Sequence, residues 1–164
     1  MNIFHLSKSP RLSAEFMCDK HIPKMLLESA QMLSTAIRRY TNLIVVEDLY
    51  KSAYQKHPMT IWVGDNRSNF RWALENAVWI DNEYAKRFNG THKSFRVIDV
   101  IINEELDKHI PKGKLTTPPQ CMPDEYKHRN YVTAYRRYYR GAKSYFAKWD
   151  RLNNTPKWWV QLNL

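Results

Sequence analysis

The stretch MCDKHIPKMLLESAQM, residues 17–32, combines the apolar stripe of an amphipathic helix with a polar side rich in ionisable groups. At about 100° per residue, one side of the helix collects apolar and small residues. These are Ile22, Met25, Leu26, Ser29, Met32, Leu33, Ala36 and Ile37. The pattern predicts a helix from about Ser13 to Arg39, with a kink or a second start at Pro23.

The polar side of this helix carries groups that can move protons or act as nucleophiles. A sector of about 100° holds Lys20, His21, Lys24, Glu28, Gln31 and Thr35. A carboxylate among cations stays ionised and can stabilise a developing positive charge, whereas a crowded lysine loses part of its charge and becomes nucleophilic. These residues predict a site for glycosidic-bond cleavage or imine formation. The alternative is a solvated face with a Lys24–Glu28 ion pair.

The rest of the chain favours an all-α fold, because its long segments show helical periodicity and only four residues are glycine. Further helices are expected at about Ile44–Tyr54, Ser68–Phe88, Phe95–Leu106 and Tyr131–Arg151. Residues 1–6 are expected to form a short strand or an extended lead-in, and Lys56–Asn66 and residues 110–127 to be irregular. The prediction is one compact domain over residues 1–164, a bundle of about four to five helices with an aromatic C-terminal tail.

Composition limits the partners and the compartment. Lys and Arg number 26 against 16 Asp and Glu, a formal charge of +10, which favours nucleic acid or another polyanion. Two cysteines are too few for a disulfide scaffold, and the first 20 residues lack the apolar run of a signal peptide. No window approaches about 18 uninterrupted apolar residues. We expect a monomeric cytoplasmic protein with no membrane contact.

Two sets of side chains are candidates for binding nucleic acid. We expect the first set to stack on an extruded base and to form hydrogen bonds with its edges. This set is His57, Trp62, Asn69, Trp72, Asn76 and Trp79. The alternative for the middle helix is burial between two packed layers. The basic side of the last long helix and its approach predict phosphate contacts from Lys127, Arg136, Arg137, Arg140 and Lys143, with a solvated cationic face as the alternative.

A zinc site is the one metal centre that the composition suggests. Cys18, His21, Cys121 and His128 are ligand types, but their spacing matches no familiar zinc motif. Glycine-rich phosphate loops and HExxH motifs are absent from the sequence. We therefore predict no metal and no cofactor.

Two resemblances sharpen these expectations. The segments MNIFHLS, CDKHIPKMLLESAQMLSTA, HPMTIW, NFRW, MPDEYK, AYRRYY, FAKW and TPKWW resemble a group of small tailed-bacteriophage proteins nearly end to end. More distantly, the order of a short lead, a long polar-faced helix with a proline, an aromatic middle helix and a last helix with an aromatic tail resembles the pyrimidine-dimer DNA glycosylases of the endonuclease V family. That family implies a compact all-α fold that kinks double-stranded DNA and flips a nucleotide.

The second resemblance also implies a mechanism, in which an N-terminal α-amine attacks the sugar and a helix carboxylate steadies the intermediate. Glu28 would take the carboxylate's place, or His21 if the prolines are superposed. The family's chain begins with threonine after methionine removal, whereas Asn2 is bulky, so we expect Met1 to be retained. Its amine, with a reference pKa of about 7.7 to 8.0, competes with Lys20 and Lys24 as the nucleophile.

The functional expectation is a base-excising DNA glycosylase, with possible lyase activity at abasic sites. Its catalytic residues are expected among Met1, Lys20, His21, Lys24, Glu28 and Gln31, with His21 as the proton shuttle. Two alternatives stay open. One is a transferase that attaches an amino acid cosubstrate to DNA during phage thymine hypermodification, and the other is a non-catalytic nucleic-acid-binding protein.

Overall fold

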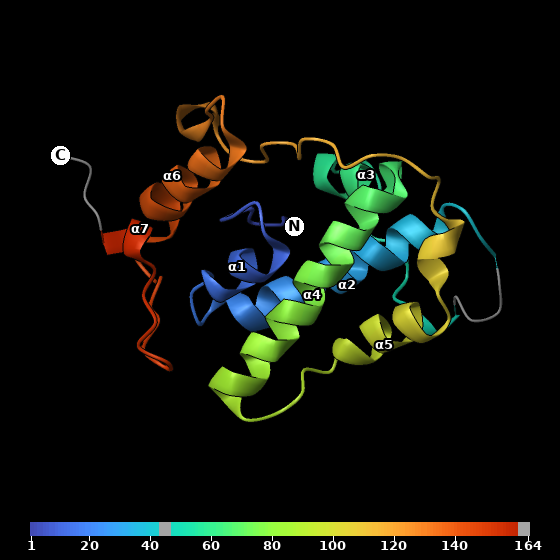
Figure 1. Ribbon diagram of the computed structural model, residues 1–164, viewed down its shortest axis with the longest axis horizontal. Helices are drawn as coiled ribbons and strands as arrows, with labels where there is room; N and C mark the ends of the chain where they lie inside the picture. The colour runs from blue at the N-terminus through green and yellow to red at the C-terminus, as the bar shows by residue number, and fades with distance from the viewer. Residues whose placement is uncertain (43–46, 161–164) are drawn as a thin grey trace.

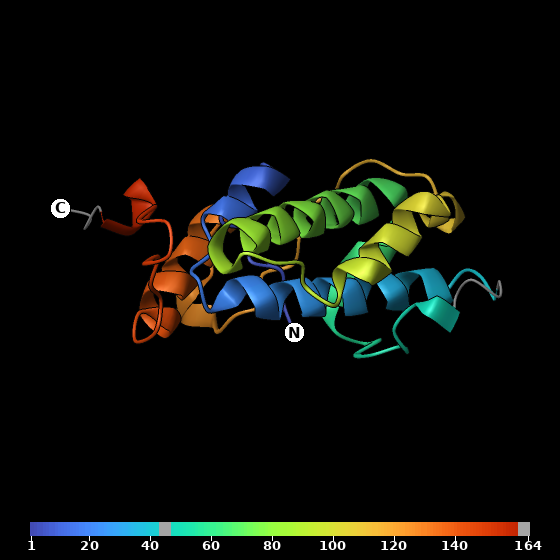
Figure 2. The same cartoon turned by 90° about the horizontal axis from the view of Figure 1, so that it is seen from below.

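The computed structural model describes residues 1–42 and 47–160, and there it consists of helices joined by irregular segments (Figures 1 and 2). The α-helices are α1 Pro10–Glu15, α2 His21–Arg38, α3 Pro58–Asp65, α4 Arg67–Phe88, α5 Phe95–Asn103, α6 Tyr131–Lys143 and α7 Lys157–Val160. Two 3₁₀ helices, η2 Leu106–His109 and η3 Asp124–Tyr126, follow α5. The described residues contain no strand, which confirms the all-α class.

The long helices α2 and α4 form the centre of the fold and pack against each other. Figure 2 shows them as two layers, with α5 beside them. Apolar faces at helical spacing build the core, so that Ile22, Leu26 and Leu33 of α2 and Phe70 and Ile80 of α4 are buried. Helices α1, α3 and α5 also pack on α4. Helix α4 is therefore covered on more than one side.

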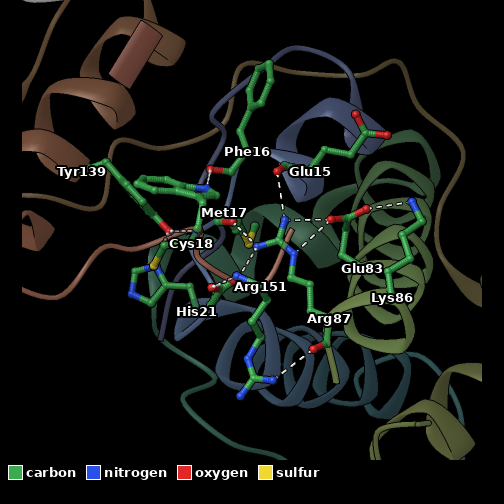
Figure 3. A network of polar contacts seen from close by, with 12 residues as sticks. Glu15, Phe16, Met17, Cys18, His21, Glu83, Lys86, Arg87, Tyr139 and Arg151 are labelled. Atoms are coloured by element: carbon green, nitrogen blue, oxygen red, sulfur yellow. Dashed lines mark hydrogen bonds and ion pairs between the residues drawn. The ribbon is translucent and has the colours of Figure 1, made fainter. Parts of the chain in front are cut away.

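The single helix predicted over Ser13–Arg39 is wrong, because α1 and α2 are separated by residues 16–20. Figure 3 shows that distant side chains satisfy the main chain of this break. The guanidinium of Arg87, at the end of α4, is fully buried and donates hydrogen bonds to the carbonyl oxygens of Glu15 at 3.1 Å and Met17 at 2.7 Å. The Cys18 N–H donates to the Tyr139 hydroxyl at 3.0 Å. These bonds replace those that a continuous helix would make.

The same guanidinium joins α4 to the α1–α2 connection through ion pairs. Arg87 lies 2.7 Å from a carboxylate oxygen of buried Glu83, one turn earlier on α4, and 3.1 Å from one of Asp19. Helix α2 begins at His21, so Pro23 lies in its first turn, where a missing N–H breaks no helical bond. The predicted second start near Pro23 is therefore close to the observed start.

Other predicted boundaries differ where tertiary contacts decide them. The segment predicted as a loop over Lys56–Asn66 contains α3, which begins after an extended His57 and carries Pro58 at its first position. The expected helix Ile44–Tyr54 falls partly outside the described residues, and residues 47–54 contain no α-helix. Helix α4 confirms the prediction for Ser68–Phe88, and α5 ends at Asn103, three residues before the predicted end.

The last long helix is shorter than predicted, because the chain leaves α6 after Lys143 and turns back over the α1–α2 connection. There the Asp19 N–H donates to the Lys148 carbonyl at 2.8 Å, and the Trp149 indole donates to the Phe16 carbonyl at 3.2 Å. Beyond this turn Trp158 is buried, which confirms that the aromatic tail packs onto the body. None of the helices in residues 1–42 and 47–160 has the length and apolar character needed to cross a membrane.

Candidate active site

The start of the chain lies against the polar side of α2, where Glu28 meets the α-amine of Met1. One carboxylate oxygen of Glu28, Oε2, accepts a hydrogen bond of 2.9 Å from the Asn2 N–H and lies 3.7 Å from the Met1 nitrogen. The other oxygen lies 3.8 Å from Lys24 Nζ. The Glu28 side chain is 14% exposed, whereas that of Lys24 is 64% exposed. The carboxylate therefore sits between the two amines.

Contacts from distant parts of the chain fix the first two residues in place. The Asn2 side-chain amide donates to the Cys121 carbonyl at 2.9 Å, and its Oδ1 accepts from the Tyr135 hydroxyl of α6 at 3.2 Å. The Thr60 hydroxyl of α3 lies 3.5 Å from Met1 Sδ and donates to it. The amine is thus held in one position by contacts within the protein, the kind of preorganisation that lowers the entropic cost of a reaction.

His57 stands at the start of α3, close to the same pair. Its Nδ1 accepts a hydrogen bond of 3.2 Å from the Met59 N–H and caps the helix. A neutral ring in this arrangement carries its proton on Nε2. Burial lowers the pKa of His57, the positive Met1 amine lowers it further, and the nearby Glu28 carboxylate opposes both effects. At neutral pH His57 is therefore a hydrogen-bond donor beside the amine and the carboxylate.

The structure separates two of the predicted catalytic residues from this pair. His21 is buried, shares a hydrogen bond of 2.7 Å with the Tyr139 hydroxyl and stacks on Phe4 with ring centroids 4.8 Å apart. Burial, followed by the charge of Lys143, lowers the pKa of His21 to about 3. At 1.5 Å per residue, its backbone lies about 10 Å along α2 from Glu28. Lys20 places its ammonium 4.9 Å from the Phe146 ring.

Gln31 lies one turn after Glu28 on α2, and its side chain is half-buried. Of the six predicted catalytic residues, the structure thus brings Met1, Lys24 and Glu28 together, with Gln31 on the same helix. Lys20 and His21 lie near α6 and the segment that follows it.

The residues expected to hold an extruded base make contacts within the protein. The Trp72 indole donates to the Lys8 carbonyl at 3.0 Å, and its ring stacks on His5 at 4.2 Å. The Asn76 amide donates to the Pro10 carbonyl at 2.7 Å. These bonds match the alternative in which α4 is packed on two sides. Trp79 is only half-buried and has the Arg11 guanidinium 4.7 Å above its ring.

The remaining two candidates, Trp62 and Asn69, bind the connection that follows η2. The Trp62 indole donates to the Thr116 carbonyl at 3.3 Å. Asn69 is fully buried, donates to the Trp62 carbonyl at 3.0 Å and exchanges two hydrogen bonds with Thr116. Both side chains therefore position a loop, and their polar groups have partners within the protein.

The basic residues of α6 differ in how far they reach the surface. Arg136 Nε donates to the Leu6 carbonyl at 2.9 Å, and the guanidinium lies 5.1 Å from the Trp158 ring. The Arg140 guanidinium lies 5.7 Å from the same ring. Lys143 Nζ is 4.7 Å from the Tyr138 ring, whereas Arg137 is exposed. Lys127, before α6, pairs with Asp124 at 2.7 Å.

Sequence patterns missed the residues that fix the amine, namely Asn2, Thr60, Cys121 and Tyr135. The partners of Asn2 lie 119 and 133 residues away, and no local pattern encodes such contacts. The signal that could have found Thr60 is the segment HPMTIW, quoted above for its resemblance to phage proteins. Both cysteines are free thiols. Among the described residues, no three His, Cys, Asp or Glu side chains are grouped so as to hold a metal ion.

The sequence model of one family, described as pyrimidine dimer DNA glycosylase, matches residues 1–95 of the 164. The chain belongs to the pyrimidine dimer DNA glycosylase family. The matched range contains Met1, Glu28 and His57, as well as α1 to α4. The substrate of this family is DNA. Searches of curated proteins and of solved structures returned no match.

Proposed function

We propose that the protein is a DNA glycosylase that uses the α-amine of Met1 as its nucleophile and Glu28 to stabilise the charged intermediate. The observation that carries this proposal is the 3.7 Å separation of the Met1 nitrogen from Glu28 Oε2 at a chain start fixed by Asn2. Both residues fall in the range that the pyrimidine dimer DNA glycosylase family matches. The substrate is double-stranded DNA with the target nucleotide turned out of the stack.

The proposed reaction begins with an attack of the amine on C1′ of the sugar. The nitrogen lone pair forms the new bond, the glycosidic bond breaks with its electron pair moving to the base, and the base takes up a proton. The C1′–O4′ bond then opens as the nitrogen lone pair forms the C=N double bond, the oxygen takes up a proton from solvent, and the product is a protonated imine. Glu28, close to the nitrogen, stabilises the positive charge that develops on the sugar and the imine.

The positions of the amines favour Met1 over the two lysines. The Met1 nitrogen lies 3.7 Å from Glu28 Oε2 at a fixed chain start. Lys24 is largely exposed and Lys20 lies against Phe146, away from Glu28. In this proposal Lys24 binds a phosphate beside the site, together with Lys127, Arg137 and Lys143.

Reduction with borohydride tests the proposal directly. Borohydride converts the imine between enzyme and an abasic site into a stable amine, and peptide mapping by mass spectrometry identifies the modified residue. We expect the sugar on the N-terminal peptide at the Met1 nitrogen, with Lys24→Ala still forming the adduct. An adduct that maps to Lys24 or Lys20, or its absence from the wild-type protein, would overturn the proposed nucleophile.

A second measurement separates the glycosylase from the two alternative functions. Nucleosides from DNA incubated with the protein are analysed by mass spectrometry, with and without a mixture of amino acids. A glycosylase releases free base in both cases. A nucleoside whose mass has increased by an amino acid would identify a transferase instead, and binding without any change of the DNA would identify a passive binder.

A further inference from the structure

Residues 111–117, between η2 and η3, form an exposed connection that is nevertheless held in one shape. The first turn of α4 holds residues 111–113 by two hydrogen bonds. The Arg67 N–H donates to the Pro111 carbonyl at 2.7 Å, and the Ser68 hydroxyl donates to the Gly113 carbonyl at 2.6 Å. Gly113 is required here, because a Cβ at this position would lie 2.6 Å from Cβ of Asn66. We call residues 111–117 the 111–117 loop.

The second half of this loop is fastened at Thr116. Its N–H donates to Asn69 Oδ1 at 2.9 Å, its hydroxyl accepts from Asn69 Nδ2 at 2.8 Å, and its carbonyl accepts from the Trp62 indole. Asn69 has no exposed surface, so both of its bonds to Thr116 are shielded from competing water on one side. Anchors at residues 111, 113 and 116 make this loop a built structure rather than a loose connection.

Leu115 stands between these anchors and points an apolar side chain outward, 55% exposed. Lys112 and Lys114, in the same loop, are also exposed. Proteins that deform duplex DNA insert apolar side chains such as leucine between base steps, and lysines beside them neutralise phosphates. A rigid, lysine-flanked leucine has the chemistry of such a wedge.

The 111–117 loop lies close to the proposed nucleophile. Trp62, which binds Thr116, is on α3, the helix whose Thr60 contacts Met1. Five residues after Thr116, the Cys121 carbonyl binds Asn2. Consecutive residues are at most about 3.6 Å apart, so Thr116 lies within about 18 Å of Cys121, whose carbonyl contacts Asn2. With a rise of about 3.4 Å per base pair, a wedge at Leu115 would enter the stack within roughly one helical turn of the target.

We propose that Leu115 is a wedge that enters the DNA stack beside the target nucleotide while Lys112 and Lys114 bind the flanking phosphates. This step opens the duplex, so that the sugar of the target can reach Met1. The proposal rests on the proposed glycosylase function. It also assigns a role to residues beyond 1–95, the range that the family model matches.

The test compares Leu115→Ala with Ile102→Ala, a matched loss of an aliphatic side chain that is 43% exposed on α5. Borohydride trapping is measured on an abasic site in duplex DNA and in the same single strand. Because unstacking a base step opposes opening of the duplex, we expect Leu115→Ala to trap the duplex about tenfold more slowly or worse. Trapping of the single strand should be unchanged, and Ile102→Ala should match the wild type on both. Equal rates for Leu115→Ala and wild type on the duplex would overturn the wedge.

An optical readout keeps the wedge testable even if no imine forms. The fluorescence of 2-aminopurine placed beside the abasic site rises when its neighbours unstack, and it is compared at equal occupancy of the DNA. Wild type should raise it and Leu115→Ala should not. A single-strand substrate that wild type fails to trap would count against the proposed function, whereas an unchanged fluorescence rise in Leu115→Ala would count against the wedge alone.

The salt dependence of DNA binding tests the role of Lys112 and Lys114. Each phosphate contact contributes about 0.9 to the slope of log Kobs against log salt concentration for duplex DNA, so Lys112→Ala with Lys114→Ala should lower that slope by about 1.8. Lys93→Ala with Lys108→Ala, two exposed lysines elsewhere, should leave it unchanged. A slope that is the same in both double variants would remove Lys112 and Lys114 from the interface.

Discussion

Glu28 Oε2 accepts the Asn2 N–H at 2.9 Å and at the same time lies 3.7 Å from the amine of the preceding residue. The carboxylate therefore has two roles that a substitution can separate. Its hydrogen bond fixes the start of the chain, and its charge faces the position where an imine would form. A side chain that keeps the hydrogen bond and loses the charge would separate the structural role of Glu28 from its proposed catalytic role.

Glu28→Gln is that substitution. Glutamine can still accept from the Asn2 N–H, so we expect an unchanged thermal midpoint. Loss of one preorganised charge opposite a developing cation typically costs about a hundredfold or more in rate, and we expect imine trapping to slow by this factor. Lys24→Gln, at an exposed partner of the same carboxylate, should change the rate less than about fivefold. A variant that is destabilised but equally active per folded molecule would contradict the assignment.

His57→Asn tests the donor beside the amine. Asparagine caps a helix as well as histidine does here, by accepting the Met59 N–H, so α3 should persist while the Nε2 donor is lost. If Nε2 donates to the substrate in the proposed reaction, loss of one such hydrogen bond, about 1.5 kcal/mol, lowers the rate about tenfold. His92→Asn is the matched control, because His92 Nδ1 accepts the Ser94 N–H in the same way before α5.

The pH profile adds an independent check on His57. Its pKa lies below the ordinary 6.5 because of burial, so the ring is neutral throughout the range above pH 6.5. Any change of activity with pH in this range should therefore come from groups other than His57. His57→Asn should therefore lower the whole profile without moving its inflection, whereas a shifted inflection would show that His57 transfers a proton.

Arg87→Met should destabilise the fold strongly. The variant leaves buried Glu83 with only the half-exposed Lys86 as an ion-pair partner, and it leaves the Glu15 and Met17 carbonyls without a donor. Breaking a buried pair costs about 3–5 kcal/mol. Arg11→Met removes the same kind of pair, with Glu15 one turn away, but at the surface, where the loss is about 1 kcal/mol or less. Urea unfolding measures both, and similar values for the two variants would refute the role of the buried pair.

Acid should destabilise the protein through His21. Burial lowers its folded pKa to about 3, whereas the unfolded value is near 6.5, so the unfolded state binds the proton first. The stability from neutral His21 is complete above pH 6.5 and is lost as pH falls toward 3, at about 1.4 kcal/mol per pH unit. His21→Gln should flatten unfolding free energy against pH, and exposed His109→Gln should not. Equal slopes would exclude this cause.

Local periodicity was sufficient to predict the long helix α4 and the polar side of α2. Helix α4 follows from the helical spacing of Phe70, Leu74 and Ala77, and Glu28 follows from the polar sector of α2. The break after α1 did not, because Arg87, about 70 residues away, stabilises it. The single domain over residues 1–164 and the likeness to phage proteins stay predictions.

Some residues of the candidate site were predictable from the sequence, whereas the way they are brought together was not. An ionisable helix face indicated Glu28 and Lys24, but the neighbours of Met1 come from segments that meet only in three dimensions. Trp62 and Asn69 were expected to hold a base, since aromatic and amide groups do so in many proteins. In the structure they anchor Thr116, and the side chain they thereby expose, Leu115, carried no signal in the sequence.

The burial of Asn2 has a practical consequence for anyone preparing this protein. Only 8% of the residue is exposed, and both its backbone and its side chain make hydrogen bonds. Any residues added before Met1 would therefore have to run alongside Glu28. An affinity tag fused ahead of Met1 would convert the primary amine into an amide and crowd the same carboxylate. Purification handles belong at the C-terminal end of the chain, where Val160, the last residue that the structure describes, is open to solvent.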